Sequence, residues 1–409
     1  MKSERSWGRL GMKSEWITHT FGDVCLRIYS GGTPSTKQAE YWNGEINWLS
    51  SGETGKRYIY DTDRKITELG VSKSSTQLAH KGDTVVASAG QGYTRGQASY
   101  LLIDTYVNQS VIVFHANAEV IDDKFLFFNL GSRYEELRQL SDGTSTRGGL
   151  SGWIVKRMEI DLPPLDEQKQ IVGILSAIDN KIELNTMINE NLEQQAQAYF
   201  VDLFITNADP NWKMGTVSDF GNVIGGGTPS KKVEEYYTSN GIAWITPKDL
   251  SNDKSKFVAH GETDITELGL AKSSATLMPK GTVLFSSRAP IGYIAIADDQ
   301  VSTNQGFKSI VPFSNVGNAF VYYYLKENLS AIENVASGST FKEVSGSTLK
   351  NFSAVIPDNE TLTEFQRFCS PLFEQQRALE YENRYLATLR DTLLPKLMNG
   401  EIDVSQVQI

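Results

Sequence analysis

The pattern of apolar and polar positions indicates many short strands interspersed with a few helices. Runs of consecutive apolar and β-branched residues are typical of buried strands, and they occur at Thr84–Ser88, Ser110–Phe114 and Thr282–Ser286. Apolar residues at three- and four-residue spacing instead predict helices over Asp123–Leu140 and Asn318–Asn328. Outside two long helical segments, the pattern therefore predicts a mixed α/β (α+β) fold.

Two long segments carry a heptad-like stripe of apolar residues with two polar members each. The first stripe consists of Ile171, Leu175, Ile178, Ile182, Asn185, Asn189, Leu192, Ala196, Tyr199 and Leu203. The second consists of Phe365, Phe368, Leu372, Gln375, Leu379, Glu382, Leu386, Leu389 and Leu393, and its helix should end at Asn399–Gly400, a good left-handed cap. Each helix could pack on its own domain alone. Two stripes of matching length with polar positions favour a long antiparallel coiled coil.

An internal repeat organises these elements. Gly31–Ser35, which reads Gly-Gly-Thr-Pro-Ser, recurs as Gly226–Ser230 at an offset of 195 residues. Further ordered matches at nearly this offset are Trp48 with Trp244, Ile66–Gly70 with Ile265–Gly269, Lys73–Ser75 with Lys272–Ser274, Asn108–Gln109 with Asn304–Gln305, and Ser151–Gly152 with Ser345–Gly346. A period of this length is the size of a domain, so the chain is a tandem duplication. The Gly-Gly-Thr-Pro-Ser turn predicts the start of a short helix, with Pro34 in its first turn.

The duplication divides the chain into five segments. Residues 1–15 form an N-terminal leader, within which Met12 rather than Met1 could be the true start. Residues 16–162 and 207–356 form two globular domains. Residues 163–206 and 357–409 form the two helices of the coiled coil.

The order domain, helix, domain, helix has a geometric consequence. If the second helix returns antiparallel along the first, the two domains lie at opposite ends of a rod and are related by an approximate two-fold axis. A helix of ~35–40 residues is about 50–60 Å long, and two major-groove sites one DNA turn apart are ~34–36 Å apart. Such a rod suits two half-sites of opposite orientation, separated by several unread base pairs. Because the domains differ in sequence, their half-sites should differ too.

The formal net charge of −10 does not exclude DNA binding, because the excess of acidic over basic residues lies mostly on the helices. Residues 16–162 carry 15 Lys/Arg against 17 Asp/Glu, and residues 211–356 carry 13 against 13. The helical stretches 166–204 and 357–404 carry 2 against 7 and 5 against 9. No apolar run approaches the ~20 residues that span a bilayer, and Cys25 and Cys369 lie in dissimilar contexts, which argues against a disulfide. We therefore expect a cytoplasmic protein with no membrane segment.

Several segments resemble the specificity subunits of Type I restriction–modification systems. The resemblance rests on the Gly-Gly-Thr-Pro-Ser opening of each unit, on Leu162–Ile171 (Leu-Pro-Pro-Leu-Asp-Glu-Gln-Lys-Gln-Ile), on Ile178–Ile182 (Ile-Asp-Asn-Lys-Ile), and on Leu389–Ile402 at the end of the second helix. It spans roughly residues 16–404. The chain differs from the family pattern at Ile356–Glu360, which lacks the double proline and the Glu-Gln pair.

The resemblance implies a subunit that is not itself an enzyme and binds double-stranded DNA. Two target recognition domains would each read one part of a bipartite site, and the coiled coil would fix the spacer. Modification (methyltransferase) subunits would bind the coiled coil, and restriction/translocase subunits would join through the complex. Adenine methylation and ATP-driven cleavage, with S-adenosylmethionine, ATP and Mg²⁺ as cofactors, would belong to those partners, so this subunit binds no cofactor. Its role would be defence against foreign DNA.

Direct readout of bases needs hydrogen-bonding side chains on surface loops. In the first domain the candidates are Ser88, Gln91, Tyr93, Arg95, Gln97, Thr144, Ser145 and Arg147, and in the second Ser287, Arg288, Tyr293, Ser339, Thr340 and Lys342. Candidates for phosphate contact are Lys56, Arg57, Lys231, Lys232 and Lys248. Each position could instead belong to an ordinary turn or be a surface charge. Asn108–Gln109 and Asn304–Gln305 are shared by both copies, so we expect them to stabilise the fold, whereas residues that read bases should differ between copies.

Signs of catalysis are weak. The sequence has no Gly-x-x-x-x-Gly-Lys-Ser/Thr phosphate loop and no Asn/Asp-Pro-Pro-aromatic motif of adenine methyltransferases. Asp63–Lys65 and Asp122–Lys124 match the acid-x-Lys triplet of nucleases, which is common by chance. The four histidines are scattered without metal-ligand spacing, so we expect neither catalytic residues nor a metal site.

Two rival classes remain at this stage. The first is a two-headed adaptor that binds protein or carbohydrate and uses the coiled coil as a spacer. The second is a hydrolase with one site in each copy, which the absence of a shared carboxylate pair or Ser/His/Asp set disfavours. Salt-dependent DNA binding would separate the adaptor from a specificity subunit.

Overall fold

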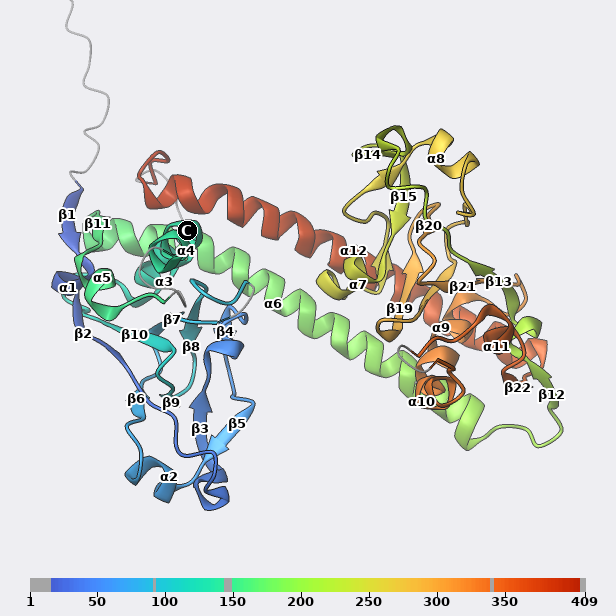
Figure 1. Cartoon of the computed structure of the whole chain (residues 1–409), viewed down its shortest axis with the longest axis horizontal. Helices are drawn as coiled ribbons and strands as arrows, with labels where there is room; N and C mark the ends of the chain where they lie inside the picture. The colour runs from blue at the N-terminus through green and yellow to red at the C-terminus, as the bar shows by residue number, and fades with distance from the viewer. Residues whose placement is uncertain (1–15, 91–92, 143–148, 339–341, 405–409) are drawn as a thin grey trace, which may run out of the picture. The chain divides into compact units, whose positions relative to one another are not determined.

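The computed structural model describes residues 16–90, 93–142, 149–338 and 342–404 of the chain, which forms two compact units (Figure 1). Unit 1 comprises residues 1–180 and 386–409, and unit 2 comprises residues 181–385. The two long helices each contribute to both units. Each unit is therefore a globular domain together with part of each long helix.

The domain of unit 1 is built on two larger sheets and one ribbon. The five-stranded sheet has the order β2-β10-β7-β8-β4, the four-stranded sheet has the order β5-β3-β9-β6, and β1 pairs with β11. β4 pairs with β8, and β3 with β9, in parallel, whereas the other strand pairs are antiparallel. The bounds are β1 Ile17–Thr20, β2 Cys25–Ser30, β3 Trp42–Leu49, β4 Tyr58–Ile59, β5 Arg64–Ile66, β6 Gln77–Ala79, β7 Thr84–Ala87, β8 Ala98–Leu101, β9 Thr105–Val107, β10 Val111–Ala116 and β11 Glu159–Leu162.

Several short helices pack against the sheets of unit 1. Their bounds are α1 Phe21–Val24, η1 Ala39–Tyr41, η2 Ser51–Glu53, α2 Glu68–Ser72, α3 Asp123–Ser132, α4 Tyr134–Asp142 and α5 Gly152–Arg157. α3 covers the five-stranded sheet, whereas η1 and α2 pack on β3 of the four-stranded sheet. The helix predicted over Asp123–Leu140 is confirmed, but it breaks at Arg133 into α3 and α4. Asp122 caps the start of α3, because its side chain accepts hydrogen bonds from two backbone N–H groups of the first turn. Its phenylalanines pack into the same buried cluster as Phe21 and Phe114.

The domain of unit 2 repeats this plan. The five-stranded sheet has the order β13-β21-β18-β19-β16, the four-stranded sheet β14-β17-β15-β20, and β12 pairs with β22. The strands are β12 Lys213–Thr216, β13 Gly221–Gly225, β14 Tyr237–Thr238, β15 Ile242–Ile245, β16 Phe257–Val258, β17 Asp264–Ile265, β18 Val283–Ser287, β19 Ile291–Ala297, β20 Ser302–Thr303, β21 Lys308–Pro312 and β22 Ser353–Ile356. The helices are η3 Asp202–Thr206, η4 Val217–Asp219, η5 Glu234–Tyr236, α7 Pro247–Asn252, α8 Glu267–Ala271, α9 Asn318–Glu327, α10 Leu329–Asn334 and α11 Gly346–Lys350.

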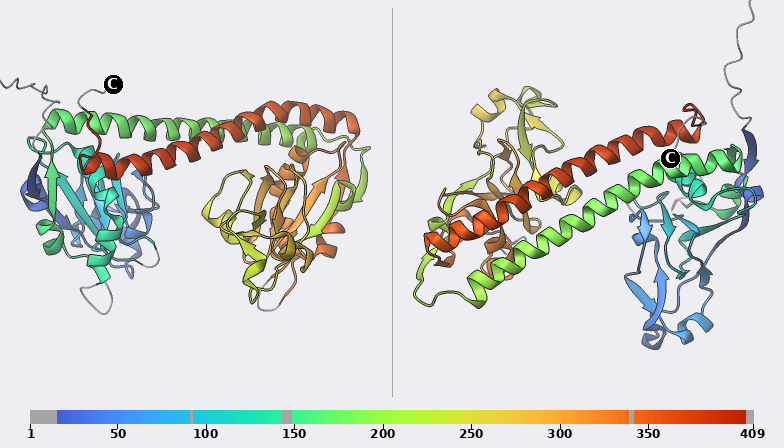
Figure 2. Two further views of the ribbon diagram at one scale, coloured as in Figure 1. Left: turned by 90° about the horizontal axis from the view of Figure 1, so that it is seen from above. Right: turned by 180° about the vertical axis from the view of Figure 1, so that it is seen from behind.

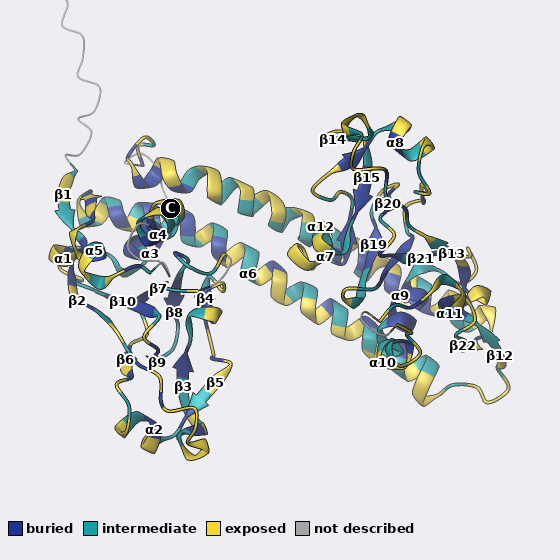
Figure 3. Cartoon of the chain, viewed as in Figure 1, coloured by how far each residue is buried: buried dark blue, intermediate teal, exposed yellow. Residues whose placement is uncertain are grey.

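The two domains match in most of their elements, as the duplication predicts. The exceptions are β3, which corresponds to β14 and β15 together, and β6, whose place is taken by an isolated bridge between Met278 and Val301. The predicted strands correspond to β7, β10 and β18, and the helix predicted over Asn318–Asn328 is α9. Dark blue sheet strands and helix faces mark the buried core in each unit (Figure 3). In unit 2 this core is strongly aromatic, because Phe320, Tyr323 and Tyr324 of α9 pack against Phe220 and Phe365.

The helix predicted at the Gly-Gly-Thr-Pro-Ser turn is wrong. Residues 31–38 form no helix, and the first helical turn in this region is η1. Instead, the N–H groups of Gly31 and Gly32 donate to the carbonyl oxygens of Asn108 and Val107 at 3.2 and 3.1 Å. A Cβ atom on Gly31 would lie 1.9 Å from the Val107 oxygen, so glycine permits this close crossing of two chain segments.

The two long helices are α6, Leu165–Val201, and α12, Asn359–Met398, and in each unit they lie side by side (Figure 2). In unit 2 the Asn185 side chain donates to Glu382 at 2.8 Å, whereas Tyr199 donates to Glu364 at 2.5 Å. Residues with higher numbers on α6 thus contact residues with lower numbers on α12. The predicted antiparallel pairing is confirmed.

The contacts along α12 differ in part from the predicted stripe. Phe365 is buried as predicted, but Gln375 is exposed and its neighbour Gln376 is buried instead. The Gln376 amide donates to the backbone oxygen of Asn189 at 3.2 Å. The stripe shifts because α12 packs against its own domain as well as against α6. α12 ends at Met398 as predicted, and Gly400 adopts a φ of +68°.

Two other expectations concern the cysteines and the membrane. Cys25 and Cys369 are both free, as predicted, and the structure buries both of them. Burial raises the pKa of each thiol to about 12. In the part of the chain that the structure describes, no helix combines the length and the apolar character needed to cross a bilayer.

Candidate nucleic-acid interface

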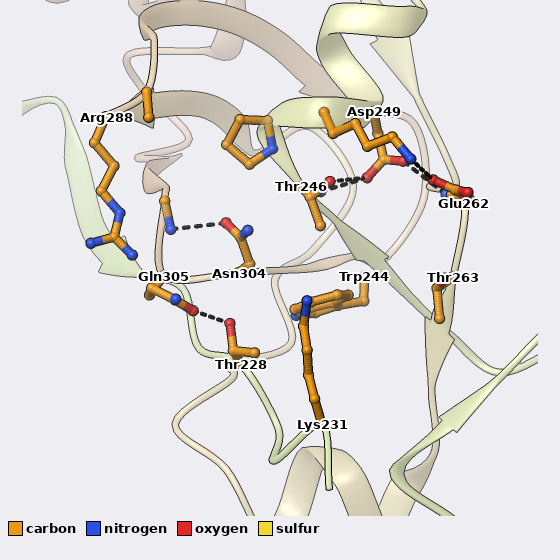
Figure 4. A pocket seen from close by; sticks show the side chains of 14 residues that line it. Thr228, Lys231, Trp244, Thr246, Asp249, Glu262, Thr263, Arg288, Asn304 and Gln305 are labelled. Atoms are coloured by element: carbon orange, nitrogen blue, oxygen red, sulfur yellow. Dashed lines mark hydrogen bonds and ion pairs between the residues drawn. The ribbon is translucent and has the colours of Figure 1, made fainter. Parts of the chain in front are cut away.

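A polar hollow of about 510 Å³ opens on the domain of unit 2 (Figure 4). It lies between the end of β15, the start of α7, the segment just before β17, and the loops that follow β13, β18 and β20. Its walls are Thr228, Lys231, Trp244, Thr246, Pro247, Lys248, Asp249, Glu262, Thr263, Arg288, Ala289, Asn304, Gln305 and Gly306. Three residues predicted to contact DNA, Lys231, Lys248 and Arg288, are thereby brought to one place.

A cap at α7 fixes one wall of the hollow. The Asp249 carboxylate accepts hydrogen bonds from the backbone N–H and the hydroxyl of Thr246, at 2.7 and 2.6 Å. Its other oxygen accepts from the backbone N–H of Glu262 at 2.9 Å. The Glu262 carboxylate in turn pairs with Lys248 at 2.6 Å. The acidic residues of this wall therefore serve structural contacts, and Lys248 remains about two-thirds exposed.

The opposite wall carries the residues that both copies share. Gln305 accepts a hydrogen bond from the Thr228 hydroxyl, and the Asn304 side chain accepts from the N–H of Gly306 at 2.8 Å. The buried Trp244 indole donates to the Gly227 oxygen at 2.9 Å. These contacts support the interpretation that Asn304–Gln305 stabilise the fold.

The same framework is present in unit 1. Thr33 donates to Gln109 at 2.5 Å, as Thr228 does to Gln305. Glu53 accepts from the N–H of Ser50 at 3.1 Å and from the N–H of Asp63 at 2.8 Å, which reproduces the cap of α7. Asp63 then pairs with Lys56 at 3.1 Å. A common scaffold thus underlies this surface in both domains.

The cations on that scaffold differ between the units. The strand registers align Arg288, Lys248 and Lys231 with Ala89, Gly52 and Thr36, so unit 1 lacks these three charges. Conversely, Thr263 at the hollow aligns with Arg64 in unit 1, because β5 pairs with β3 as β17 pairs with β15.

Arg64 was missed as a candidate by sequence reasoning. Its guanidinium lies 3.7 Å from the ring centre of Trp42 and 5.4 Å from that of Trp48, and the residue is exposed. Stacking on two aromatic rings holds an arginine in a defined orientation. Comparison of the two copies could have identified Arg64, because it aligns with a threonine, Thr263, beside a segment that otherwise matches between the copies.

The remaining candidates differ in exposure. The structure gives no support to a DNA contact by the side chains of Ser88 and Ser287, because both residues are buried in the sheet. Tyr93 is 82% exposed, and Lys232 and Lys342 are exposed, whereas Arg95, Gln97 and Tyr293 are half-buried. Gln91, Thr144, Ser145, Arg147, Ser339 and Thr340 lie outside the described residues.

Arg57 occupies a different environment from the other candidates. Its Nε lies 2.8 Å from the Asp179 carboxylate of α6, and its guanidinium faces the rings of Phe127 and Phe128. The side chain is 28% exposed. The structure thus assigns Arg57 to the junction between the domain and the helix. In the described ranges no group of His, Cys, Asp or Glu side chains is arranged to hold a metal ion.

Comparison with protein families gives one match that covers most of the chain. The model of the Type I restriction modification DNA specificity domain matches residues 13–194 and again residues 210–383. The two matches coincide with the two copies of the internal repeat.

Individual relatives agree with the family match. The Type I restriction enzyme HindI specificity subunit of Haemophilus influenzae is 25% identical over 477 aligned positions, which cover 95% of this chain and all of that protein. The MjaIX specificity subunit of Methanocaldococcus jannaschii is 37% identical over 206 residues, and that match spans 50% of this chain and 47% of that protein. A crystal structure of a Type I restriction–modification S subunit from M. genitalium has a TM-score of 0.60 at 16% identity, with 95% and 97% of the chains covered, and shows the same fold.

Proposed function

Because the chain belongs to the family of Type I restriction–modification DNA specificity subunits, with two target recognition domains, we propose that each domain reads one half of a bipartite DNA site while α6 and α12 set the spacer. The subunit is itself non-catalytic. In this proposal the hollow of unit 2 and its counterpart in unit 1 face the major groove. The cations there are the side chains that discriminate base edges and bind phosphates.

One observation carries this assignment of the reading surface. Both domains keep the same scaffold of capped turns and Thr–Gln hydrogen bonds, but place an arginine at different positions. Arg64 is exposed, whereas Arg288 is half-buried and lies 3.6 Å from Glu343. Arg288 serves unit 2 and Arg64 serves unit 1. Arginine is the side chain that most often reads guanine, through its two parallel donors. Two domains that read different half-sites require this combination of a common frame with different donors.

The helix pair offers a surface for modification subunits. On the long helices in unit 2, the exposed large apolar side chains include Leu184, Met187, Tyr381 and Tyr385, which are 52, 61, 70 and 63% exposed. Exposed apolar clusters on a protein of this kind are typical of protein–protein contact. This surface, which we call the outer helix face, is our candidate for the binding site of the methyltransferase partners.

The geometry of α6 indicates that the outer helix face is not covered by the domain of unit 2. Successive residues of an α-helix are 100° apart, so Leu184 and Met187 lie about 100° and 160° to one side of Asn185, which contacts α12. Glu193 and Phe200, which contact the domain of unit 2, lie roughly 80° and 60° to the other side. On α6, the outer helix face therefore points away from the domain of its unit.

The same holds for α12. Glu380 accepts hydrogen bonds from the backbone N–H groups of Lys256 and Phe257, so its side of the helix faces the domain. Tyr381 and Tyr385 lie on the other side of the line of contact with α6. For two antiparallel helices, this places them on the same face as Leu184 and Met187.

The proposal extends to the whole assembly and its cofactors. Modification subunits bound to the outer helix face carry S-adenosylmethionine and methylate adenine. Restriction/translocase subunits join through them and use ATP and Mg²⁺. The specificity subunit contributes DNA recognition and the spacing of the two half-sites, and it binds no cofactor.

An exchange of one domain tests the proposal. Replacing residues 16–162 by the first recognition domain of another family member, in a strain that supplies the partner subunits, should change one half of the methylated motif and leave the other half and the spacer unchanged. A motif that changes in both halves, or in neither, would contradict the proposal. Binding of the complex to the original duplex should also weaken steeply with salt, because phosphate contacts release counterions.

A further inference from the structure

The residue that precedes the parallel edge strand of each five-stranded sheet is a cation. Arg57 precedes β4 in unit 1, and Lys256 precedes β16 in unit 2. The carbonyl oxygen of Arg57 accepts from Tyr100 of β8 at 3.0 Å, and that of Lys256 accepts from Ile296 of β19 at 2.7 Å. The two cations thus occupy the same place in the duplicated domain.

In unit 1 this cation joins the domain to both long helices. Nε of Arg57 and the hydroxyl of Tyr58 both donate to Oδ2 of Asp179 on α6, at 2.8 and 2.6 Å. Oδ1 of the same carboxylate accepts from Arg390 on α12 at 3.1 Å. The Asp179 side chain is 2% exposed. A single buried carboxylate therefore ties the edge of the sheet to α6 and α12.

In unit 2 the equivalent cation joins the same three elements with different partners. Lys256 pairs with Glu193 on α6 and donates to Gln376 on α12 at 2.7 Å. Glu193 also accepts from Lys326 at 2.6 Å and from the Tyr323 hydroxyl at 2.8 Å. The Lys256 side chain is 6% exposed. Burial by itself would raise the pKa of Glu193, but Lys256 and Lys326 outweigh it and hold that pKa at about 2, so the carboxylate stays charged.

The cation positions correspond between the units, but the carboxylates do not. Arg57 lies over the ring of Phe127 on α3, and Lys256 lies over Tyr322 at the corresponding position of α9. When α6 and α12 are aligned as corresponding helices of the two copies, Asp179 of α6 matches Phe373 of α12. The ring centre of Phe373 lies 4.2 Å from the Lys256 amine. Both units thus contain the same ionic junction built from different acids.

Buried charges of this kind determine geometry more than stability. Removing ions from water costs nearly as much as their attraction returns, so well-packed apolar side chains can give equal stability. A carboxylate that accepts three hydrogen bonds, however, is satisfied in one arrangement only. An apolar contact between a sheet edge and a helix tolerates sliding and rotation that this arrangement does not.

We infer that Arg57–Asp179–Arg390 in unit 1 and Lys256–Glu193–Gln376 in unit 2 are positioning residues, which fix each recognition domain on the helix pair and thereby restrict the spacer that the subunit accepts. The inference rests on the proposed function, in which the helix pair sets the spacer. These residues do not read bases themselves. They act through the orientation of the domain that does.

The test uses the complete complex with its partner subunits and a panel of duplexes. The duplexes carry both half-sites with the native spacer, or with spacers one or two base pairs shorter or longer. The main variant is Lys256→Met combined with Glu193→Leu, which removes the charges but keeps the volume and apolar packing. Tyr323→Phe is a milder variant, because it removes only the hydroxyl that donates to Glu193 and accepts from Lys256, and leaves the charges in place. Glu136→Gln, within the domain of unit 1, is the matched control.

The wild-type complex should prefer the native spacer, and the double variant should reduce this preference by about threefold or more, within the range of coupling between contacting residues. Tyr323→Phe should reduce it less, and Glu136→Gln should leave it unchanged. Binding to an isolated half-site should stay the same in all three variants. An undiminished spacer preference in both folded variants of the junction would overturn the inference. If the wild type itself showed no spacer preference, the proposed function would fail instead.

Discussion

Replacing Glu193 by glutamine should lower the stability of unit 2 more than most single substitutions. The change leaves Lys256, 6% exposed, and the half-buried Lys326 without their shared counter-charge. Removing one partner of a buried ion pair costs about 3–5 kcal/mol. Glu193 is itself 22% exposed, and a glutamine can still accept one hydrogen bond, so we expect the lower end, about 3 kcal/mol. For a unit of this size, 1 kcal/mol shifts the melting temperature by roughly 2–4 °C, which gives a loss of roughly 6–12 °C.

Thermal unfolding of the purified full-length chain, followed by calorimetry, measures this effect. Lys181→Ala is the matched control, because it breaks the Lys181–Glu382 pair of the same helices, in which both side chains are more than 40% exposed. Exposed pairs of this kind contribute less than about 1 kcal/mol. The double variant Lys256→Met with Glu193→Leu should melt between Glu193→Gln and the wild type, because it removes the buried Lys256 charge but leaves Lys326 without its partner. A Glu193→Gln melting temperature within about 2 °C of the wild type would refute the assignment of Glu193 as the counter-charge of the buried Lys256 and the half-buried Lys326.

Further predictions concern pH, base reading and assembly. The pKa of Glu193 is about 2 in the folded chain, against an ordinary value of 4.5. The stability that the charged carboxylate contributes to unit 2 is therefore complete above pH 4.5 and is lost as the pH falls towards 2. The difference in melting temperature between the wild type and Glu193→Gln should shrink over that range. Arg288→Ala should weaken discrimination at one base pair of one half-site by about 1–3 kcal/mol, and Arg64→Ala should do so in the other half-site only, as measured by methylation of mismatched duplexes. Leu184→Asp and Tyr381→Asp should each weaken binding of the modification subunit, measured by titration calorimetry, without changing the melting temperature of the free chain by more than about 2 °C.

The duplication and the long helices could be predicted because their signals are repetitive. The matches at one offset predicted two copies of one domain, and the heptad stripes predicted two paired helices, which α6 and α12 confirm. The exact stripe on α12 could not be predicted. Gln376 rather than Gln375 is buried, since that helix also contacts Lys256 of its own domain. A sequence pattern does not distinguish these two packing partners.

The candidate interface was predicted only in part, because exposure and pairing depend on tertiary contacts. Arg57 has the sequence context of a surface cation, yet it pairs with Asp179, more than a hundred residues away. Ser287 matches the pattern of a loop residue, yet the sheet buries it. Arg64 escaped notice because its surroundings, the rings of Trp42 and Trp48, come together only when β3 pairs with β5. Sequence comparison of the two copies can locate such positions, but it cannot say which of them face solvent.

Methylome sequencing of a strain with intact partner subunits, with and without this gene, measures the recognised sequence directly. We expect the deletion to abolish adenine methylation at a single bipartite motif, whose two unlike halves are separated by one fixed number of unspecified base pairs. Loss of a contiguous motif, loss of a motif with a variable gap, or an unchanged methylome would contradict a subunit that reads two half-sites at a set distance.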